Sequence, residues 1–240
     1  MTTAMQQRSF NGDIPRINNA NNPHMACLLL LDTSGSMAME SERGTRPIDE
    51  LVKAVNRFKT EVCKDPATRA ILDVAIVEFS TDVRIVQEFV PIEYMEPVSL
   101  EAQGGTNMTK GLRTAIDMVA ERRHLYTNFG GAYCPWIVMI TDGYPSDSID
   151  DIAEEILVLD QMDKLRLWSL AVEGADVSLL MKLGHGKRVL ALNGYDFTGF
   201  FDWLHKSMAS ISVSSPGEKA RGVNLPANVG LVKEISSDLM

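Results

Sequence analysis

Two stretches of the chain are apolar at almost every position, residues 25–31 and residues 136–141. Strands that are covered on both faces of a sheet show such unbroken runs, whereas half-exposed strands alternate apolar and polar positions. Both stretches therefore predict central strands. Runs rich in β-branched and aromatic residues predict four further strands, at residues 71–79, 83–90, 165–172 and 188–192.

Elsewhere apolar residues recur every three or four positions, which is the period of an amphipathic helix. The first such stretch begins at Pro47, where the fixed φ of proline suits a first helical position. A second begins at Met108, and either Thr106 or Asn107 supplies its N-cap. Three more helices are expected over residues 149–159, 177–183 and 197–211.

The alternation of strands and helices predicts an α/β fold, with a Rossmann-like, doubly wound and mostly parallel sheet of six strands. Residues 71–79 and 83–90 are joined by only three residues, which indicates a hairpin and hence one antiparallel edge strand. We expect three segments: a polar N-terminal arm (1–24), one domain (25–211) and a C-terminal tail (212–240).

Carboxylates and hydroxyls follow the two central strands directly. Asp32, Ser34 and Ser36 come after the first strand, and Asp142 comes at the end of the other, while Thr106 follows a glycine pair before a helix. Ligands of doubly wound sheets bind at the carboxyl ends of the strands, so these side chains are expected to meet there. Hard oxygen atoms of this kind suit a small divalent cation. The alternative is that each loop is an ordinary turn whose side chains bond to their own backbone.

In this order the residues resemble the metal-ion-dependent adhesion site of the von Willebrand factor A family, written Asp-x-Ser-x-Ser, then Thr, then Asp. The resemblance spans roughly residues 25 to 210 and implies the von Willebrand factor A fold. It also implies a metal site that consists of Asp32, Ser34, Ser36, Thr106 and Asp142. In that family the two serines and either the threonine or the last aspartate contact the metal directly, and the remaining groups act through water.

The expected metal is Mg²⁺, which prefers octahedral oxygen ligands at about 2.0–2.1 Å and keeps several waters; Mn²⁺ is able to replace it. Family members bind a partner through such a metal, when an Asp or Glu of the other protein completes the octahedron. The resemblance therefore implies a metal-dependent protein-interaction module without enzymatic activity, whose partner is another protein that supplies an acidic residue.

A narrower resemblance is carried by the segments Leu-Leu-Leu-Asp-Thr-Ser-Gly-Ser-Met and Trp-Ile-Val-Met-Ile-Thr-Asp-Gly-Tyr-Pro-Ser-Asp and by the aromatic segment 197–203. These are similar to bacterial cytoplasmic proteins of the TerY type. That resemblance implies a role in tellurium resistance and stress response, with a stress-response kinase or phosphatase as a candidate partner.

Composition narrows the functional classes further. The net charge of −9 argues against nucleic acid as a partner, because a phosphate backbone is normally bound by a basic surface. The apolar run at residues 25–31 is too short to cross a membrane and has no signal-peptide flanks. We therefore expect a cytoplasmic protein with no membrane partner. The three cysteines and four histidines show no zinc-ligand spacing.

Two other functions are compatible with parts of this pattern. An apolar strand that ends in aspartate also resembles haloacid-dehalogenase-like phosphotransferases, in which Asp32 would be the nucleophile. Those enzymes carry a second carboxylate two residues later, where this chain has Ser34, so a general acid/base is missing. The other alternative is a scaffold that holds no metal.

Overall fold

The central strand β1 (Met25–Asp32) separates two hydrophobic cores. In the computed structural model, which describes residues 21–40, 44–217 and 222–232, all eight residues of β1 are buried. Successive side chains of a strand point to opposite faces of the sheet. Leu29 and Leu31 accordingly belong to one core cluster, and Leu28 and Leu30 to the other. An unbroken apolar run is thus the pattern of a strand that is covered on both sides.

The described chain forms one seven-stranded sheet in the order β3-β2-β1-β4-β5-β6-β7. β1 lies between β2 and β4 and is parallel to both. The edge strands β3 and β7 are antiparallel to their neighbours. The other strands are β2 (Leu72–Phe79), β3 (Val83–Pro91), β4 (Trp136–Thr141), β5 (Arg166–Ala171), β6 (Val189–Leu192) and β7 (Val229–Leu231).

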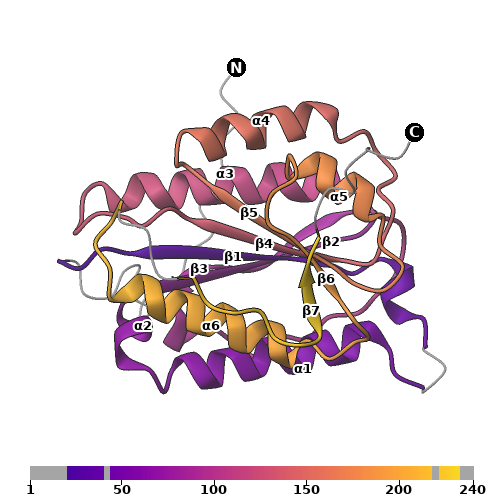
Figure 1. Ribbon diagram of the computed structural model, residues 1–240, viewed down its shortest axis with the longest axis horizontal. Helices are drawn as coiled ribbons and strands as arrows, with labels where there is room; N and C mark the ends of the chain where they lie inside the picture. Colours follow the sequence, from indigo (N-terminus) through magenta and orange to yellow (C-terminus); the bar gives the residue numbers. More distant parts are fainter. Residues whose placement is uncertain (1–20, 41–43, 218–221, 233–240) are drawn as a thin grey trace.

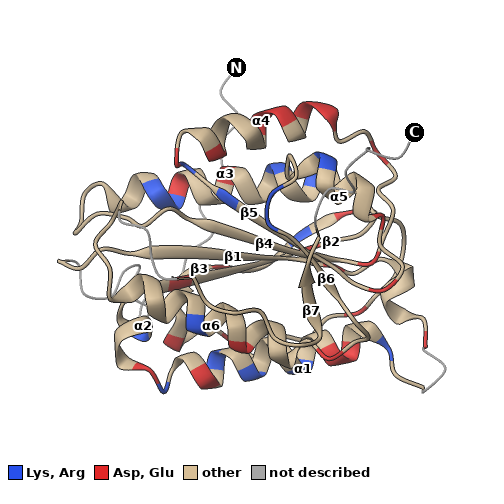
Figure 2. Cartoon of the chain, in the orientation of Figure 1, with Lys and Arg blue, Asp and Glu red and all other residues tan. Residues whose placement is uncertain are grey.

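Helices cover both faces of this sheet (Figure 1). On one face lie α3 (Met108–Tyr126), α4 (Asp150–Gln161) and α5 (Val177–Leu183). On the other face lie α1 (Pro47–Val62), α2 (Pro66–Ile71) and α6 (Thr198–Ser212). Two short 3-10 helices, Gly35–Ala38 and Ile92–Tyr94, complete the fold. Figure 2 shows the charged residues mainly on helices and loops, while the middle of β1 and of β4 carries none.

The predicted α/β fold is confirmed, but the sheet has seven strands instead of six. The additional strand β7 lies in the predicted C-terminal tail and pairs antiparallel with β6, so both edges of the sheet are antiparallel. β7 is only three residues long, and α2 only six, so neither is long enough to show a period in the sequence. The six predicted strands and the five predicted helices all form.

The predicted N-terminal arm lies largely outside the described residues, which begin at position 21. At the end of the arm, His24 is buried and its backbone N–H donates to the carbonyl of Gly131 at 3.0 Å. Within the described part of the chain, no helix is both long enough and apolar enough to cross a membrane.

Candidate metal centre

Three loops meet at the edge of the sheet where the parallel strands end. β1 ends at Asp32, and the loop after β4 carries Asp142; because β1 and β4 are parallel neighbours, the two loops that follow them emerge side by side. The loop before α3 joins them through backbone hydrogen bonds. The N–H of Gly35 donates to the carbonyl of Gly104 at 3.0 Å, and that of Gln103 donates to the carbonyl of Thr33 at 2.8 Å.

Asp32 occupies the centre of the site and is fully buried. The backbone N–H of Ser34 donates to its Oδ1 at 2.8 Å, and the hydroxyl of Thr141 donates to its Oδ2. Thr141 in turn accepts a hydrogen bond from the N–H of Gly143 at 3.1 Å. Thr141 thus orients Asp32; its only signal in the sequence is its position as the last residue of a predicted central strand.

The two serines connect the first loop to the third. Ser34 Oγ and Ser36 Oγ lie 2.9 Å apart, and the hydroxyl of Ser36 donates to Asp142 Oδ1 at 2.7 Å. Ser34 and Asp142 are buried, whereas Ser36 is half-buried. Four of the five predicted site residues are therefore linked through short hydrogen bonds between side chains and backbone.

Thr106 joins this group through packing around Gly143. A Cβ atom at Gly143 would lie 2.9 Å from Thr106 Oγ1 and 3.1 Å from Asp32 Oδ2, which leaves room for glycine alone. The carbonyl of Thr106 accepts hydrogen bonds from Ser146, from its N–H at 2.9 Å and its hydroxyl at 3.0 Å, and these fasten the second loop to the third. The structure thus brings all five predicted residues together at one edge of the sheet.

The neighbouring residues hold the loops in place. Asn107, not Thr106, caps α3: its side chain accepts a hydrogen bond from the N–H of Lys110 at 3.3 Å. Gly104 has a φ of +80°, a conformation that costs glycine little and other residues more. Asp147 accepts from the N–H of Thr109 at 2.9 Å near the start of α3, which occupies one of its oxygens.

The two buried carboxylates have no cationic partner within the described residues. Burial raises the pKa of Asp142 to about 6, while the hydrogen bond from Ser36 lowers it and the charge of Asp32 raises it. Burial also raises the pKa of Asp32, against the hydrogen bonds from Thr141 and Ser34. No Lys, Arg or His of the described chain forms an ion pair with either aspartate. A bound cation would remove the cost of this buried negative charge.

The donor set fits a hard divalent cation. Two carboxylates and three hydroxyls supply only oxygen atoms, which Mg²⁺ prefers, and two negative charges balance its own. The described residues hold no group of three or more His, Cys, Asp or Glu side chains suited to a metal, as transition-metal sites usually require. The chemistry of the site therefore favours a metal held through hydroxyls and water as much as through carboxylates.

Comparison with known proteins identifies the domain. Residues 27–144 match the model of the von Willebrand factor type A domain, a range that contains all five site residues. Integrator complex subunit 6-B of Xenopus laevis is 30% identical over 140 residues, which is 54% of this chain and 16% of that relative. The chain therefore spans about a sixth of the length of that relative.

Solved structures share the fold at low sequence identity. The von Willebrand factor type A protein from Catenulispora acidiphila superimposes with a TM-score of 0.60 at 15% identity, over 78% of this chain and 43% of that one. The pilus adhesin SpaC from Lactobacillus rhamnosus GG superimposes with a TM-score of 0.64 at 14% identity, over 81% of this chain and 31% of that one. Together, the matched residues and the shared fold show that this chain contains a von Willebrand factor type A domain, a kind of domain that generally mediates protein interactions.

Proposed function

We propose that this chain is a metal-dependent protein-interaction module in which Asp32, Ser34, Ser36, Thr106 and Asp142 hold Mg²⁺, with Mn²⁺ as a substitute. The observation that carries the proposal is the pair of buried carboxylates, which have hydroxyl partners and no cationic partner in the described chain. A buried charge without compensation is costly, so an arrangement of this kind is best explained by a cation that the chain does not itself supply.

Each residue has a distinct part in the proposed site. Asp32 is locked by the N–H of Ser34 and the hydroxyl of Thr141, so it is oriented before any ligand arrives. Ser34 and Ser36 present neutral hydroxyl oxygens, which leave the positive charge of the ion largely uncompensated. An acidic side chain of a partner protein is then the expected further ligand, because a metal whose direct ligands are mostly neutral attracts a carboxylate strongly.

The same geometry argues against a role for Asp32 as a nucleophile. A carboxylate nucleophile must be accessible, but Asp32 is 0% exposed and both of its oxygens accept hydrogen bonds. The residue two positions later, Ser34, offers no second carboxylate for proton transfer. We therefore propose a module without enzymatic activity.

The cellular setting rests on resemblance. The TerY-type segments favour a cytoplasmic protein of tellurium resistance or stress response, with a kinase or phosphatase of such a system as the partner. The Xenopus relative is by name a subunit of a complex, which agrees with an interaction role.

The open coordination position is testable with Mn²⁺ and a small carboxylate. Mn²⁺ bound to the full chain speeds water-proton relaxation through its own water ligands, and acetate should reduce this enhancement by displacing one of them. Acetamide, which has the same shape and no charge, should have much less effect. If acetate and acetamide behaved alike on the Mn²⁺-loaded protein, the proposed bridge to a partner carboxylate would be wrong.

A matched pair of threonine variants tests the ligand set. Thr106→Ala removes a proposed ligand, whereas Thr114→Ala removes a hydroxyl on α3, the helix that follows Thr106, and this hydroxyl donates to the carbonyl of Lys110 at 3.0 Å. Thr106→Ala should weaken Mn²⁺ binding at least about 10-fold, in line with the loss of a metal-shell group, and Thr114→Ala should leave it unchanged. Equal affinities in both variants would exclude Thr106 from the site.

A further inference from the structure

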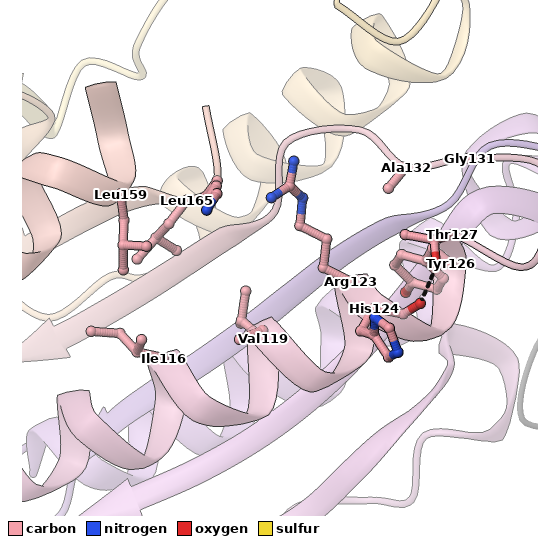
Figure 3. Close-up of a pocket in the computed structure, with 12 residues that line it drawn as sticks. Ile116, Val119, Arg123, His124, Tyr126, Thr127, Gly131, Ala132, Leu159 and Leu165 are labelled. Atoms are coloured by element: carbon pink, nitrogen blue, oxygen red, sulfur yellow. Dashed lines mark hydrogen bonds between the residues drawn. The ribbon is translucent and has the colours of Figure 1, made fainter. Parts of the chain in front are cut away.

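A pocket of about 520 Å³ (Figure 3) is lined by residues that precede β4 and β5, so it lies at the opposite end of these strands from the candidate metal centre. It is lined by the last turns of α3, by Gly131 and Ala132 before β4, and by Lys164 and Leu165 before β5. The metal residue Thr106 precedes the other end of α3, and a helix of 19 residues is roughly 28 Å long at about 1.5 Å per residue. The pocket is thus a separate site.

The floor of the pocket is apolar. Ile116 and Val119 project from α3 toward Leu159 and Leu165, which come from α4 and from the segment before β5 (Figure 3). Ile116, Val119 and Leu165 are almost fully buried and Leu159 is partly exposed, so together they form the concave apolar floor of the pocket. Apolar pockets with a few polar groups at the rim are the usual form of a binding site.

The rim of the pocket is basic and lacks acidic residues. Arg123, His124 and Lys164 line it, and no Asp or Glu does. Most Lys and Arg side chains of the described chain form an ion pair, but Arg123 and Lys164 form none with any described residue. In a protein with a net charge of −9, two such cations beside one apolar pocket indicate complementarity to an acidic ligand.

We propose that this pocket docks an acidic peptide segment of a partner protein, which places an apolar side chain between α3 and α4 and pairs its carboxylates with Arg123 and Lys164. Helical or extended segments of this kind use apolar anchors for affinity and flanking charges for orientation. The pocket is a second contact surface, beyond the metal-dependent one, and it works without a metal.

The test uses peptides selected on the full chain from a library of displayed random 12-residue sequences, with their affinities measured by fluorescence polarisation. Selected peptides should combine an aromatic or long aliphatic residue with nearby Asp or Glu. The double variant Arg123→Glu/Lys164→Glu should bind them at least 10-fold more weakly. The control Arg69→Glu/Lys206→Glu changes the net charge equally at two exposed cations that also form no ion pair within the described chain, and it should bind as the unmodified protein does.

Two further variants distinguish binding at this pocket from non-specific charge attraction and from binding at the candidate metal centre. Ala120→Trp keeps every charge but fills the pocket from an exposed position of α3, so it should also abolish peptide binding. Chelators and Asp32→Ala should have no effect, which distinguishes failure here from failure of the metal proposal. Equal loss in both charge-reversed variants would show non-specific attraction and overturn the proposal. Peptide binding that appears only after deletion of residues 1–20 would also overturn the proposal, because those residues would then be what occupies the pocket. The deletion is a relevant test because His24 lies beside the pocket, where its backbone N–H donates to the carbonyl of Gly131.

Discussion

Asp73 and Asp32 lie on neighbouring strands of one sheet, and both carboxylates are buried, yet their surroundings differ in one respect. Asp73 Oδ2 accepts hydrogen bonds from Arg122 at 2.8 Å and from the hydroxyl of Tyr126 at 2.6 Å. Asp32 accepts hydrogen bonds only from neutral donors, Ser34 and Thr141. Within the described residues, one buried aspartate is thus paired with a cation and the other is not.

This difference distinguishes a structural cluster from a candidate functional site in the same sheet. The Asp73 cluster, which consists of His24, Asp73, Arg122 and Tyr126, has a cation stacked among its own aromatic rings, with Arg122 5.3 Å from the ring centre of Tyr126. At the candidate metal centre Asp32 is as deeply buried as Asp73, and no Lys, Arg or His of the described residues forms an ion pair with it. Burial of a carboxylate is therefore not what marks the candidate site; the missing counter-charge is what supports our proposal.

The largest effect is expected when the Asp73 cluster is broken. Asp73→Ala leaves the guanidinium of Arg122, which is only 7% exposed, without its carboxylate, and should lower the free energy of unfolding by about 3–5 kcal/mol. Urea unfolding of the variant measures this. The double variant Asp73→Leu/Arg122→Met should recover most of the loss, since no charge then stays buried. A small loss in Asp73→Ala would mean that Arg122 reaches solvent.

Removal of the metal should have the next largest effect on the free energy of unfolding. This effect should depend on the residues of the candidate metal centre and not on the Asp73 cluster. Mg²⁺ at 100 times its dissociation constant should raise the free energy of unfolding by about 2.7 kcal/mol, because it binds the folded chain alone. Ser36→Ala removes a hydroxyl that links Ser34 to Asp142, and it should remove most of this gain. A Mg²⁺ response in Ser36→Ala as large as in the unmodified chain would exclude this serine as a ligand.

The charge of Asp142 should destabilise the metal-free protein. Its pKa is raised from 3.8 to about 6, so the folded state binds the proton more tightly than the unfolded state, and stability falls as the pH rises from about 4 to about 6. Asp142→Asn should abolish this fall. At pH 7 without metal the variant should be about 2 kcal/mol more stable, and at pH 4 nearly equal to the parent. Urea unfolding at both pH values measures the difference.

A smaller effect distinguishes two adjacent residues, Thr106 and Asn107. Asn107→Ala removes the N-cap of α3 and should cost about 1 kcal/mol of stability with no change in metal affinity. Thr106→Ala should show the opposite pattern, with weaker metal binding and little loss of stability. Thermal unfolding and metal titration of both variants measure the two effects. If both variants lost stability and metal affinity to the same extent, the two residues would not have separate roles.

Much of this arrangement follows from local sequence. The unbroken apolar runs at 25–31 and 136–141 predict central parallel strands, and parallel neighbours bring Asp32 and Asp142 to one edge. The convergence of Ser34, Ser36 and Thr106 on that edge was predicted from the motif and is seen in the structure. The role of these residues as metal ligands stays a prediction.

Other features could not be predicted, because they depend on pairings between distant residues. The Asp73 cluster draws its members from four positions, and only the packing of α3 on β2 brings Arg122 to Asp73. Thr141 becomes a partner of Asp32 only when β4 lies against β1. β7 is recognisable only through its pairing with β6, because three residues are too few to show a strand pattern in the sequence.

A calorimetric titration of Mg²⁺ into chelator-stripped protein tests the proposed metal site, with Asp32→Ala as the control and Asp73→Asn as a variant of a second buried aspartate. We expect one binding site per chain in the unmodified protein, no binding in Asp32→Ala, and unchanged binding in folded Asp73→Asn. If Mg²⁺ bound Asp32→Ala as well as the unmodified chain, or bound neither, the two buried carboxylates at the end of β1 and β4 would not be a metal site.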